Sequence, residues 1–330
     1  MWSYIIRRLL YNIPVYLGIL LLVMLALRVN DPVTAYQGKN ATAEQKEQLR
    51  KDMGLDRPFL VQYGTFVSRV VTLNFKDRSW EEKRPIGQMI RAAVPPTIMI
   101  TVPQLFLTAS ISIVIGLVCS FYRGRLPDKS LMFAAVLGMS ISYLVYIMMG
   151  QYYGAYVLGG KGITPFEVEG YEPIFSFEPN APEKASFFMP GNWMKYCALP
   201  VLIGVIVGMG YDTRFYRAVM VEECTRDYIT TARAKGATNR KIMFVHMLKN
   251  AMIPIITRIM ISLPFLIAGS ILAEYYFNIP GMGRLLINSI NSKDFPVVQY
   301  VTALFAAVVI FTVILTDVLY AVVDPRVRLS

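Results

Sequence analysis

The stretch TIMITVPQLFLTASISIVIGLVCSFY, from Thr97 to Tyr122, contains no charged side chain. A helix needs roughly 20 mostly apolar residues to cross the hydrocarbon core of a bilayer, and this stretch is longer than that. Helices buried inside soluble proteins seldom remain uncharged over such a length. We therefore predict that this segment spans a membrane.

Five further apolar runs indicate an all-α integral membrane protein with six transmembrane helices. Only 17% of the residues are charged, whereas soluble domains average about 25%. The first run is too long for the core of a signal peptide, so we expect it to be retained. The five runs cover residues 9–29, 130–158, 196–211, 251–273 and 296–323.

The distribution of charge predicts the orientation. The chain carries a net charge of +11, and Lys and Arg gather in the short loops 123–129 and 213–250 and at both termini, whereas loop 159–195 is acidic. Short basic loops stay in the cytoplasm, so both termini are expected there. The predicted domains are a cytoplasmic end with the first helix (1–29), a partly structured extracytoplasmic segment (30–96), a five-helix permease domain (97–323) and a cytoplasmic tail (324–330).

Two local features refine this picture. Residues 43–53 have a helical pattern, with Thr42 as a candidate N-cap. The spans themselves contain few ionisable groups: Asp317 lies well inside one, and Arg28, Asp212 and Arg258 lie near span ends. Proton-driven carriers place several such groups at mid-membrane, so energy from another source is favoured.

No motif for catalysis or metal binding is present in the sequence. His246 is the only histidine, which excludes HExxH, and the three cysteines have no CxxC spacing. A nucleotide-binding loop and a GxSxG motif are also absent from the sequence. We therefore predict no catalytic, cofactor-binding or metal-binding residue in this chain.

Residues 222–254 form a loop that is too long to be a simple connector. Ile229, Ala232 and Gly236 recur at helical spacing, and so do Ile242, Val245 and Lys249. The small residues Ala232, Ala234 and Gly236 would let a partner approach closely, and Gly236 can end a helix. We predict two short helices with a bend, although an ordinary solvated basic loop would share this composition.

This loop resembles the cytoplasmic EAA loop of type I ABC importer permeases, in the form found in the dipeptide and oligopeptide family. Similar motifs follow the fifth span and stand at the C-terminus, and Gly54-Leu55-Asp56-Arg57-Pro58 with Gln62-Tyr63 matches early in the chain. The order of the matches resembles the first of the two permeases in such systems. The residues that carry the loop resemblance are Asp227, Tyr228, Thr230, Thr231, Ala232, Arg233, Ala234, Lys235, Gly236, Arg240 and Lys241. The other motif residues are Asn250, Pro254, Glu274, Pro280, Gly281, Gly283, Asp324, Pro325 and Arg326.

The resemblance implies a permease subunit in a bacterial cell membrane. Its partners would be a second permease subunit, two cytoplasmic ATPase subunits that bind ATP with Mg, and an extracytoplasmic peptide-binding (lipo)protein. It implies import of oligopeptides or dipeptides, with the 222–254 loop coupling the permease to an ATPase. Related importers often carry a glutamate where Thr230 stands, so the basic residues of the loop are alternative ATPase contacts.

Other functions remain open at this stage. Nickel or metal-chelate permeases of the same family share the pattern, and a stand-alone secondary carrier would also be a multi-span protein. A membrane enzyme is the third alternative, and no motif in the chain supports it. Peptide length, side-chain preference and the residues that line the pathway are not encoded in any motif.

Overall fold

The computed structural model describes residues 2–28, 33–36, 42–52, 54–162, 165–171 and 190–323. Within these residues all regular secondary structure is helical, apart from one isolated bridge between Arg78 and Pro85. The chain separates into two compact units. The first contains residues 1–95 and 280–314, and the second contains residues 96–279 and 315–329.

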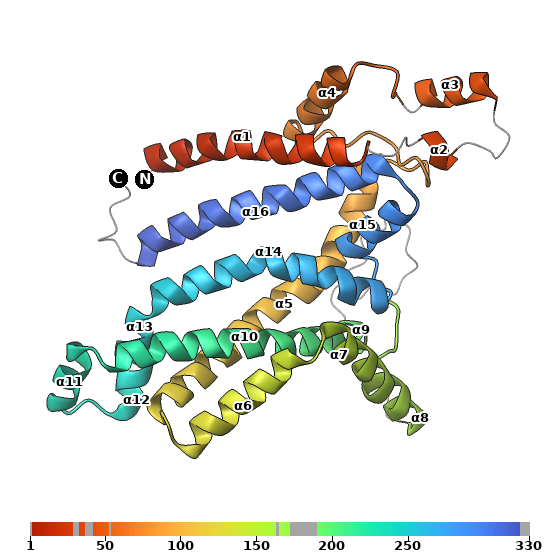
Figure 1. Cartoon of the computed structure of the whole chain (residues 1–330). Coiled ribbons are helices and arrows are strands. Elements are labelled where there is room, and N and C mark those ends of the chain that lie inside the picture. Colours follow the sequence, from red (N-terminus) through yellow and green to blue (C-terminus); the bar gives the residue numbers. More distant parts are fainter. Residues whose placement is uncertain are drawn as a thin grey trace. The chain divides into compact units, whose positions relative to one another are not determined.

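The first unit packs long apolar helices against short ones (Figure 1). Tyr16 of α1 donates a hydrogen bond from its hydroxyl to the Ala303 carbonyl of α16, at 3.0 Å. Tyr63 of α4 donates to the Leu17 carbonyl at 2.8 Å. Its helices are α1 (Trp2–Ala26), α2 (Val33–Tyr36), α3 (Ala43–Asp52), α4 (Phe59–Val71), the beginning of α5 (Ile86–Phe121), α15 (Met282–Asn291) and most of α16 (Phe295–Val323).

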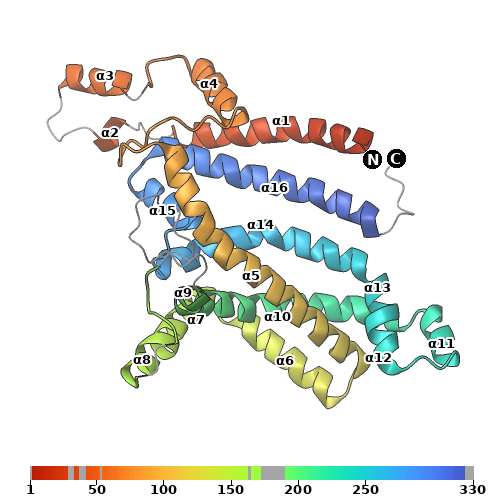
Figure 2. The same cartoon turned by 180° about the vertical axis from the view of Figure 1, so that it is seen from behind.

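The second unit is built around α10 (Ala198–Cys224), which lies beside α6 (Leu126–Ser140) over much of its length (Figure 2). Three short helical pieces follow α6: α7 (Tyr143–Met149), the π-helix η1 (Gly150–Val157) and α8 (Leu158–Gly160). The remaining elements are α9 (Pro190–Tyr196), α11 (Asp227–Ala234), α12 (Asn239–Lys241), the π-helix η2 (Ile242–Met247), α13 (Leu248–Asn250) and α14 (Met252–Tyr276).

The helix lengths agree with a polytopic membrane protein. Among the described residues, four helices are long and apolar enough to cross a membrane, and two bent helix pairs raise this number to six if each pair is one span. Apolar spans must satisfy their backbone groups internally, which helices do. The predicted all-α membrane fold class is therefore confirmed.

The structure differs from the predicted boundaries in three places. The predicted third span bends by 91° between α6 and α7, because Ile141 adopts an extended conformation with ψ of 135°. Helix α5 begins at Ile86 rather than Thr97, and α10 continues to Cys224 rather than ending near Tyr211. The polar residues at the end of the predicted fourth span did not end the helix, because Asp212 and Arg217 both have charged partners.

The predicted helix cap at Thr42 is confirmed. The Gln45 backbone N–H donates to the Thr42 hydroxyl at 3.3 Å, and the Gln45 side chain accepts from the Thr42 N–H at 3.0 Å. This reciprocal pair is a capping box, and it begins α3. The predicted C-terminal residue of this helix, Met53, lies outside the described residues, as does the tail with Asp324, Pro325 and Arg326.

Close packing of α6 on α10 depends on Gly210. A Cβ atom at this position would lie 2.7 Å from the Ala135 carbonyl oxygen and 2.7 Å from the Met139 Cβ. A backbone carbonyl cannot move aside as a flexible side chain can, so the two helices approach this closely only with glycine. Small residues at helix contacts are a common device of membrane proteins for the same reason.

We predict that Gly210→Ala destabilises the folded protein by about 1–3 kcal/mol, the usual cost of overpacking a close contact. Thermal unfolding in detergent measures this effect. Gly18→Ala in α1 is the matched control, because a Cβ there meets nothing within 4 Å. Equal melting temperatures for the two variants would contradict a close α6–α10 contact at Gly210.

Candidate functional site

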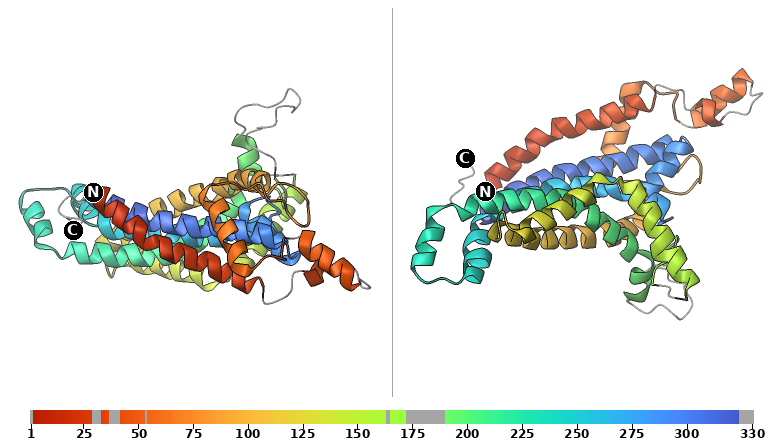
Figure 3. Two further views of the ribbon diagram at one scale, coloured as in Figure 1. Left: turned by 90° about the horizontal axis from the view of Figure 1, so that it is seen from above. Right: turned by 60° about the horizontal axis from the view of Figure 1, so that its bottom comes forward.

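The segment from Asp227 to Asn250 forms a helical hairpin that projects beyond the end of α10 (Figure 3). Gly236 ends its first helix with φ of +77°, a left-handed conformation that glycine adopts without strain. The Gly236 N–H donates to the Arg233 carbonyl at 2.9 Å, and the Ala237 N–H donates to the Ala232 carbonyl at 3.1 Å. These two bonds form a Schellman motif, so the predicted helix end at Gly236 is confirmed.

A second short helical stretch begins after this turn. The Thr238 side chain accepts a hydrogen bond from the Lys241 backbone N–H and caps the stretch that starts at Asn239. The Asn250 side chain donates to the His246 carbonyl at 2.9 Å. Pro254 lies in the first turn of α14, where a missing N–H is tolerated. The predicted pair of short helices with a bend is therefore present.

The inward face of the hairpin is firmly packed. Ile229, Ala232, Ile242 and Met247 are at most 8% exposed. They join a core cluster with apolar residues from three long helices: Leu117 of α5, Tyr216 and Met220 of α10, and Ile255 of α14. A movement of the hairpin therefore displaces apolar contacts with all three helices.

The structure differs in two details from the helix faces that were predicted for this hairpin. Val245 is 51% exposed and Lys249 is exposed, so the predicted apolar face through these residues is wrong. The π-helical turn η2 places residues five apart on the same side, which buries Ile242 with Met247 instead. Ala232 packs into the core of this chain, so among the three small residues Ala234 and Gly236 remain exposed.

The outward face of the hairpin is polar, basic and accessible. Tyr228 is partly buried beneath it and donates from its hydroxyl to Glu223. Burial, together with this hydrogen bond, raises the pKa of Tyr228 to about 12, so the phenol remains neutral at physiological pH. The sequence analysis did not single out Phe244, which is 47% exposed beside Val245. The exposed residues of the candidate loop are Asp227, Thr230, Thr231, Arg233, Ala234, Lys235, Gly236, Arg240 and Lys241.

Two ion pairs hold the helices beneath this hairpin. Asp128 of α6 is 2% exposed and accepts two bonds from the Arg217 guanidinium of α10, at 2.6 and 2.7 Å, and one from the Gly124 N–H at 2.8 Å. Arg258 of α14 donates to Asp212 of α10 at 2.8 Å. Each pair joins α10 to another helix. The two parallel bonds between Asp128 and Arg217 fix the relative orientation of these side chains in addition to pairing their charges.

In the motif that follows the fifth predicted span, Glu274, Gly281 and Gly283 are buried, whereas Pro280 is exposed. Glu274 has no exposed surface and accepts a hydrogen bond from the Thr97 hydroxyl of α5 at 2.7 Å. In the first unit, Gly281 precedes α15, in which Gly283 is buried. Pro280 directly precedes Gly281, the N-cap residue of α15. These contacts give the motif residues a role in packing.

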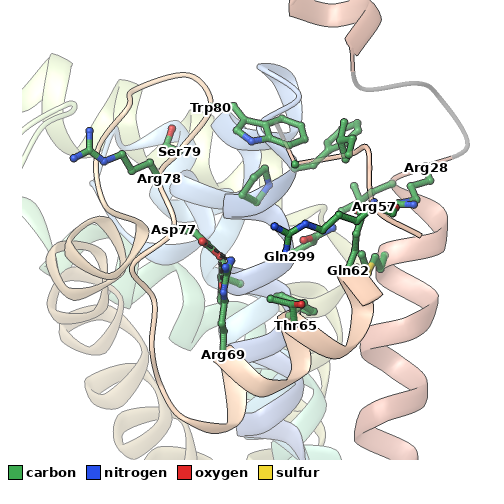
Figure 4. Close-up of a pocket in the computed structure, with 18 of the residues that line it drawn as sticks. Arg28, Arg57, Gln62, Thr65, Arg69, Asp77, Arg78, Ser79, Trp80 and Gln299 are labelled. Carbon is green, nitrogen blue, oxygen red and sulfur yellow. Dashed lines mark hydrogen bonds and ion pairs between the residues drawn. The ribbon is translucent and has the colours of Figure 1, made fainter. Parts of the chain in front are cut away.

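The first unit contains a polar cavity of 610 Å³ among α1, α4, the loop 77–83 and the beginning of α16 (Figure 4). Asp77 is held by Arg69 at 2.5 Å and by the Tyr300 hydroxyl at 2.5 Å. Arg28 donates to Gln62 and lies over the Phe59 ring. The basic residues that line the cavity outnumber the acidic ones. They are Arg28, Lys51, Arg57, Arg69, Arg78 and Lys83, against Asp56 and Asp77.

Asp294 anchors the loop that borders this cavity. It accepts hydrogen bonds from the Ser79 hydroxyl and from the backbone N–H groups of Trp80, at 3.1 Å, and Glu81, at 3.3 Å. Asp294 is 2% exposed, so these hydrogen bonds replace the ones that water would make to an exposed carboxylate. The motif that begins at Gly54 and includes Gln62 therefore lies at this cavity. No pattern in the sequence indicated that Asp294 would anchor the neighbouring loop.

The helical bundle has the fold of a type I ABC importer permease, the membrane subunit of such a transporter. The model of the family "binding-protein-dependent transport system inner membrane component" matches residues 112–329, and the model of the N-terminal part of such components matches residues 1–101. This chain belongs to that family, in its dipeptide and oligopeptide branch.

Relatives cover the whole chain. A protein of Brucella ovis (strain ATCC 25840), named as a peptide permease, is 32% identical over 338 residues, which span 100% of both chains. The glutathione transport system permease protein GsiC of Escherichia coli (strain K12) is 32% identical over 331 residues and 99% of both chains. The MetNI methionine ABC transporter, solved in inward-facing conformations, matches with a TM-score of 0.55 at 15% identity, over 73% of this chain and 99% of that chain, and this likeness concerns the fold.

We predict that Arg217→Gln destabilises the protein by about 3–5 kcal/mol, because it leaves a buried carboxylate without its counter-charge. The double variant Asp128→Asn with Arg217→Gln should be less destabilised than the single variant. Thermal unfolding in detergent tests both. Arg226→Gln is the control, since its ion pair with Glu222 is exposed and should contribute at most about 1 kcal/mol.

Proposed function

We propose that this chain is one permease subunit of an ATP-driven peptide importer and that the hairpin 227–250 binds a cytoplasmic ATPase subunit. The observation that carries the proposal is the two-sided construction of the hairpin. Its inner face packs on α5, α10 and α14, and its outer face is accessible and basic. Such an element can pass a movement of a bound motor to three long helices at once, as rigid-body switching requires.

The charge distribution supports a cytoplasmic position for this hairpin. Arg233, Lys235, Arg240 and Lys241 are exposed on a short loop, and such loops remain on the cytoplasmic side. Both termini would then also be cytoplasmic. Thr230 is exposed where related importers often have a glutamate, so the basic residues are the candidate partners for acidic groups of the ATPase.

The chemistry of ATP hydrolysis would reside in the partners. Two ATPase subunits would bind ATP with Mg, a second permease subunit would complete the pathway, and an extracytoplasmic binding protein would deliver the substrate. The names of the relatives, which refer to peptide and glutathione transport, favour short peptides over nickel or metal chelates as the substrate.

The proposed orientation places the polar cavity of the first unit on the extracytoplasmic side. Its excess of basic side chains suits acidic side chains on the rim of the binding protein, since complementary charges steer association. We propose that two exposed residues of its lining contribute to that contact: Arg57, and Arg78, whose side chain points outward from the edge of the cavity (Figure 4).

We predict that Ala234→Arg lowers ATP-driven uptake at least about tenfold, because a long charged side chain would replace a small one at the ATPase contact. Uptake in proteoliposomes with the complete complex measures it, and pull-down of the ATPase locates the defect. Ala234→Ser, which keeps the side chain small, should behave as the wild type. Ala232→Arg is unsuitable, because it would also disrupt the buried core. Normal uptake by Ala234→Arg would rule out this coupling surface.

We predict that Arg57→Glu with Arg78→Glu weakens binding-protein-stimulated ATP hydrolysis about threefold to tenfold and reduces its dependence on salt. Titration of the binding protein against the reconstituted complex measures both effects. Lys46→Glu with Lys76→Glu is the matched control, because it reverses the same number of charges at exposed lysines that do not line the cavity. A loss of equal size in the control would indicate a general charge effect rather than a specific contact.

A further inference from the structure

Helix α4 exposes an apolar face that carries no charge. Leu60, Val61 and Val71 are 75%, 48% and 70% exposed. Gly64 and Ser68 lie between them on the same side of the helix, because residues three and four apart share a face. Proteins that stay in water seldom gather large apolar side chains on an open surface, and such a patch marks contact with a membrane or a partner.

Helix α3, in the same N-terminal segment, shows the opposite surface chemistry. Its exposed charged residues are Glu44, Lys46, Glu47, Arg50 and Lys51. Helix α4 contains one charged residue, Arg69, and the guanidinium of Arg69 pairs with Asp77 at 2.5 Å. Water solvates the charges of α3, whereas the exposed face of α4 offers water no charge to solvate.

The threonine hydroxyls on or beside this face are paired within the helix. Thr72 donates from its hydroxyl to the Ser68 carbonyl at 2.8 Å, and Thr65 donates to the Val61 carbonyl at 2.8 Å. A hydroxyl that is bonded to its own helix keeps its partner when the helix leaves water. These threonines therefore do not oppose contact of α4 with an apolar medium.

The contact of α4 with α1 places part of α4 at the depth of a membrane span. Residues Arg7–Ala26 of α1 are long and apolar enough to cross a bilayer. Tyr63 of α4 donates to the Leu17 carbonyl at 2.8 Å, and Leu17 lies about 14 Å from Ala26 at 1.5 Å per residue. Leu22 and Leu25, in the same half of this span, are 67% and 46% exposed. Helices α1 and α4 thus expose apolar side chains over the same half of the span.

A different side of α4 borders the polar cavity of the first unit. Gln62, Thr65 and Arg69 line that cavity, and Figure 4 shows these three side chains pointing into it. At 100° per residue they lie roughly opposite Leu60 and Val71 on the helix. A helix with one apolar and one polar side is suited to the boundary between the acyl chains and the head groups of a leaflet.

We propose that α4 is an interfacial helix whose exposed face rests in the lipid leaflet at the Arg28 end of α1. Acyl chains of phospholipid contact Leu60, Val61 and Val71, and the polar side remains open to the water of the cavity. Helix α4 then forms a wall between the bilayer and this cavity. The proposal places one helix of the predicted extracytoplasmic segment 30–96 within the membrane.

Lipid fits this face better than a protein partner because the face continues, at the same depth, the apolar surface that α1 presents. Acyl chains need neither hydrogen-bond partners nor a matched shape. The competing occupant is a helix of a second subunit that packs on Gly64 and Ser68, since small residues four apart allow two helices to approach closely. A partner helix would close the face to lipid, and the experiment separates the two occupants on that basis.

The test places a fluorescent probe on α4 within the complete complex. Leu60→Cys and Val71→Cys are made separately, labelled with a nitrobenzoxadiazole maleimide and reconstituted in phosphatidylcholine vesicles. Lipid with brominated acyl chains should lower the fluorescence of each probe about twofold or more, because the face lies within reach of the chains. Leu22→Cys on α1 is the lipid-facing control and should respond alike. Lys46→Cys on α3 is the water-facing control and should keep its fluorescence.

The unsubstituted complex gives the background, because its three cysteines are buried or partly buried. Folded yield is recorded for each variant, and either α4 position is sufficient for the test. A response like that of Lys46→Cys would overturn the proposal. Quenching in the isolated subunit but not in the complete complex would also overturn it, since a partner would then cover the face. The measurement involves no transport, so its outcome is independent of the proposed substrate.

Discussion

Helix α10 is the element on which the second unit depends. It supplies Arg217 to the pair with Asp128 of α6 and Asp212 to the pair with Arg258 of α14. It also supplies the glycines that let α5 and α6 approach closely. In a bilayer the hydrophobic effect does little to hold helices together, so close packing and polar contacts between helices become decisive. Most contacts described for this unit therefore converge on one helix.

The packing of the hairpin 227–250 on α10 links it to the other long helices of the second unit. The inner face of the hairpin packs on Tyr216 and Met220 of α10, close in the chain to Arg217. Close-packed protein interiors transmit displacement rather than absorb it. A force on the exposed outer face would therefore reach α10 and, through its ion pairs, α6 and α14.

The cavities of the two units differ in the chemistry of their linings. In the lining of the first unit's cavity, basic side chains outnumber acidic ones, and charge interactions of this kind act at a distance and weaken with salt. The surface of the cavity among α5, α7, α10 and α14 of the second unit is mostly apolar, with the buried pair Asp212–Arg258 at its edge. The cavity of the first unit therefore suits recognition of a charged protein surface.

Local patterns in the sequence were sufficient to predict the apolar spans, the capping box at Thr42 and the helix end at Gly236, because each depends on residues within a few positions. They were insufficient for the bend between α6 and α7, for the face that η2 buries and for the inward position of Ala232. The partnership of Asp128 with Arg217, 89 residues apart, and that of Asp212 with Arg258, 46 residues apart, likewise emerged only from the packed helices. The physical reason is that a run of apolar residues is enough to form a membrane helix, whereas the partner of each polar side chain is set by which helix packs beside it.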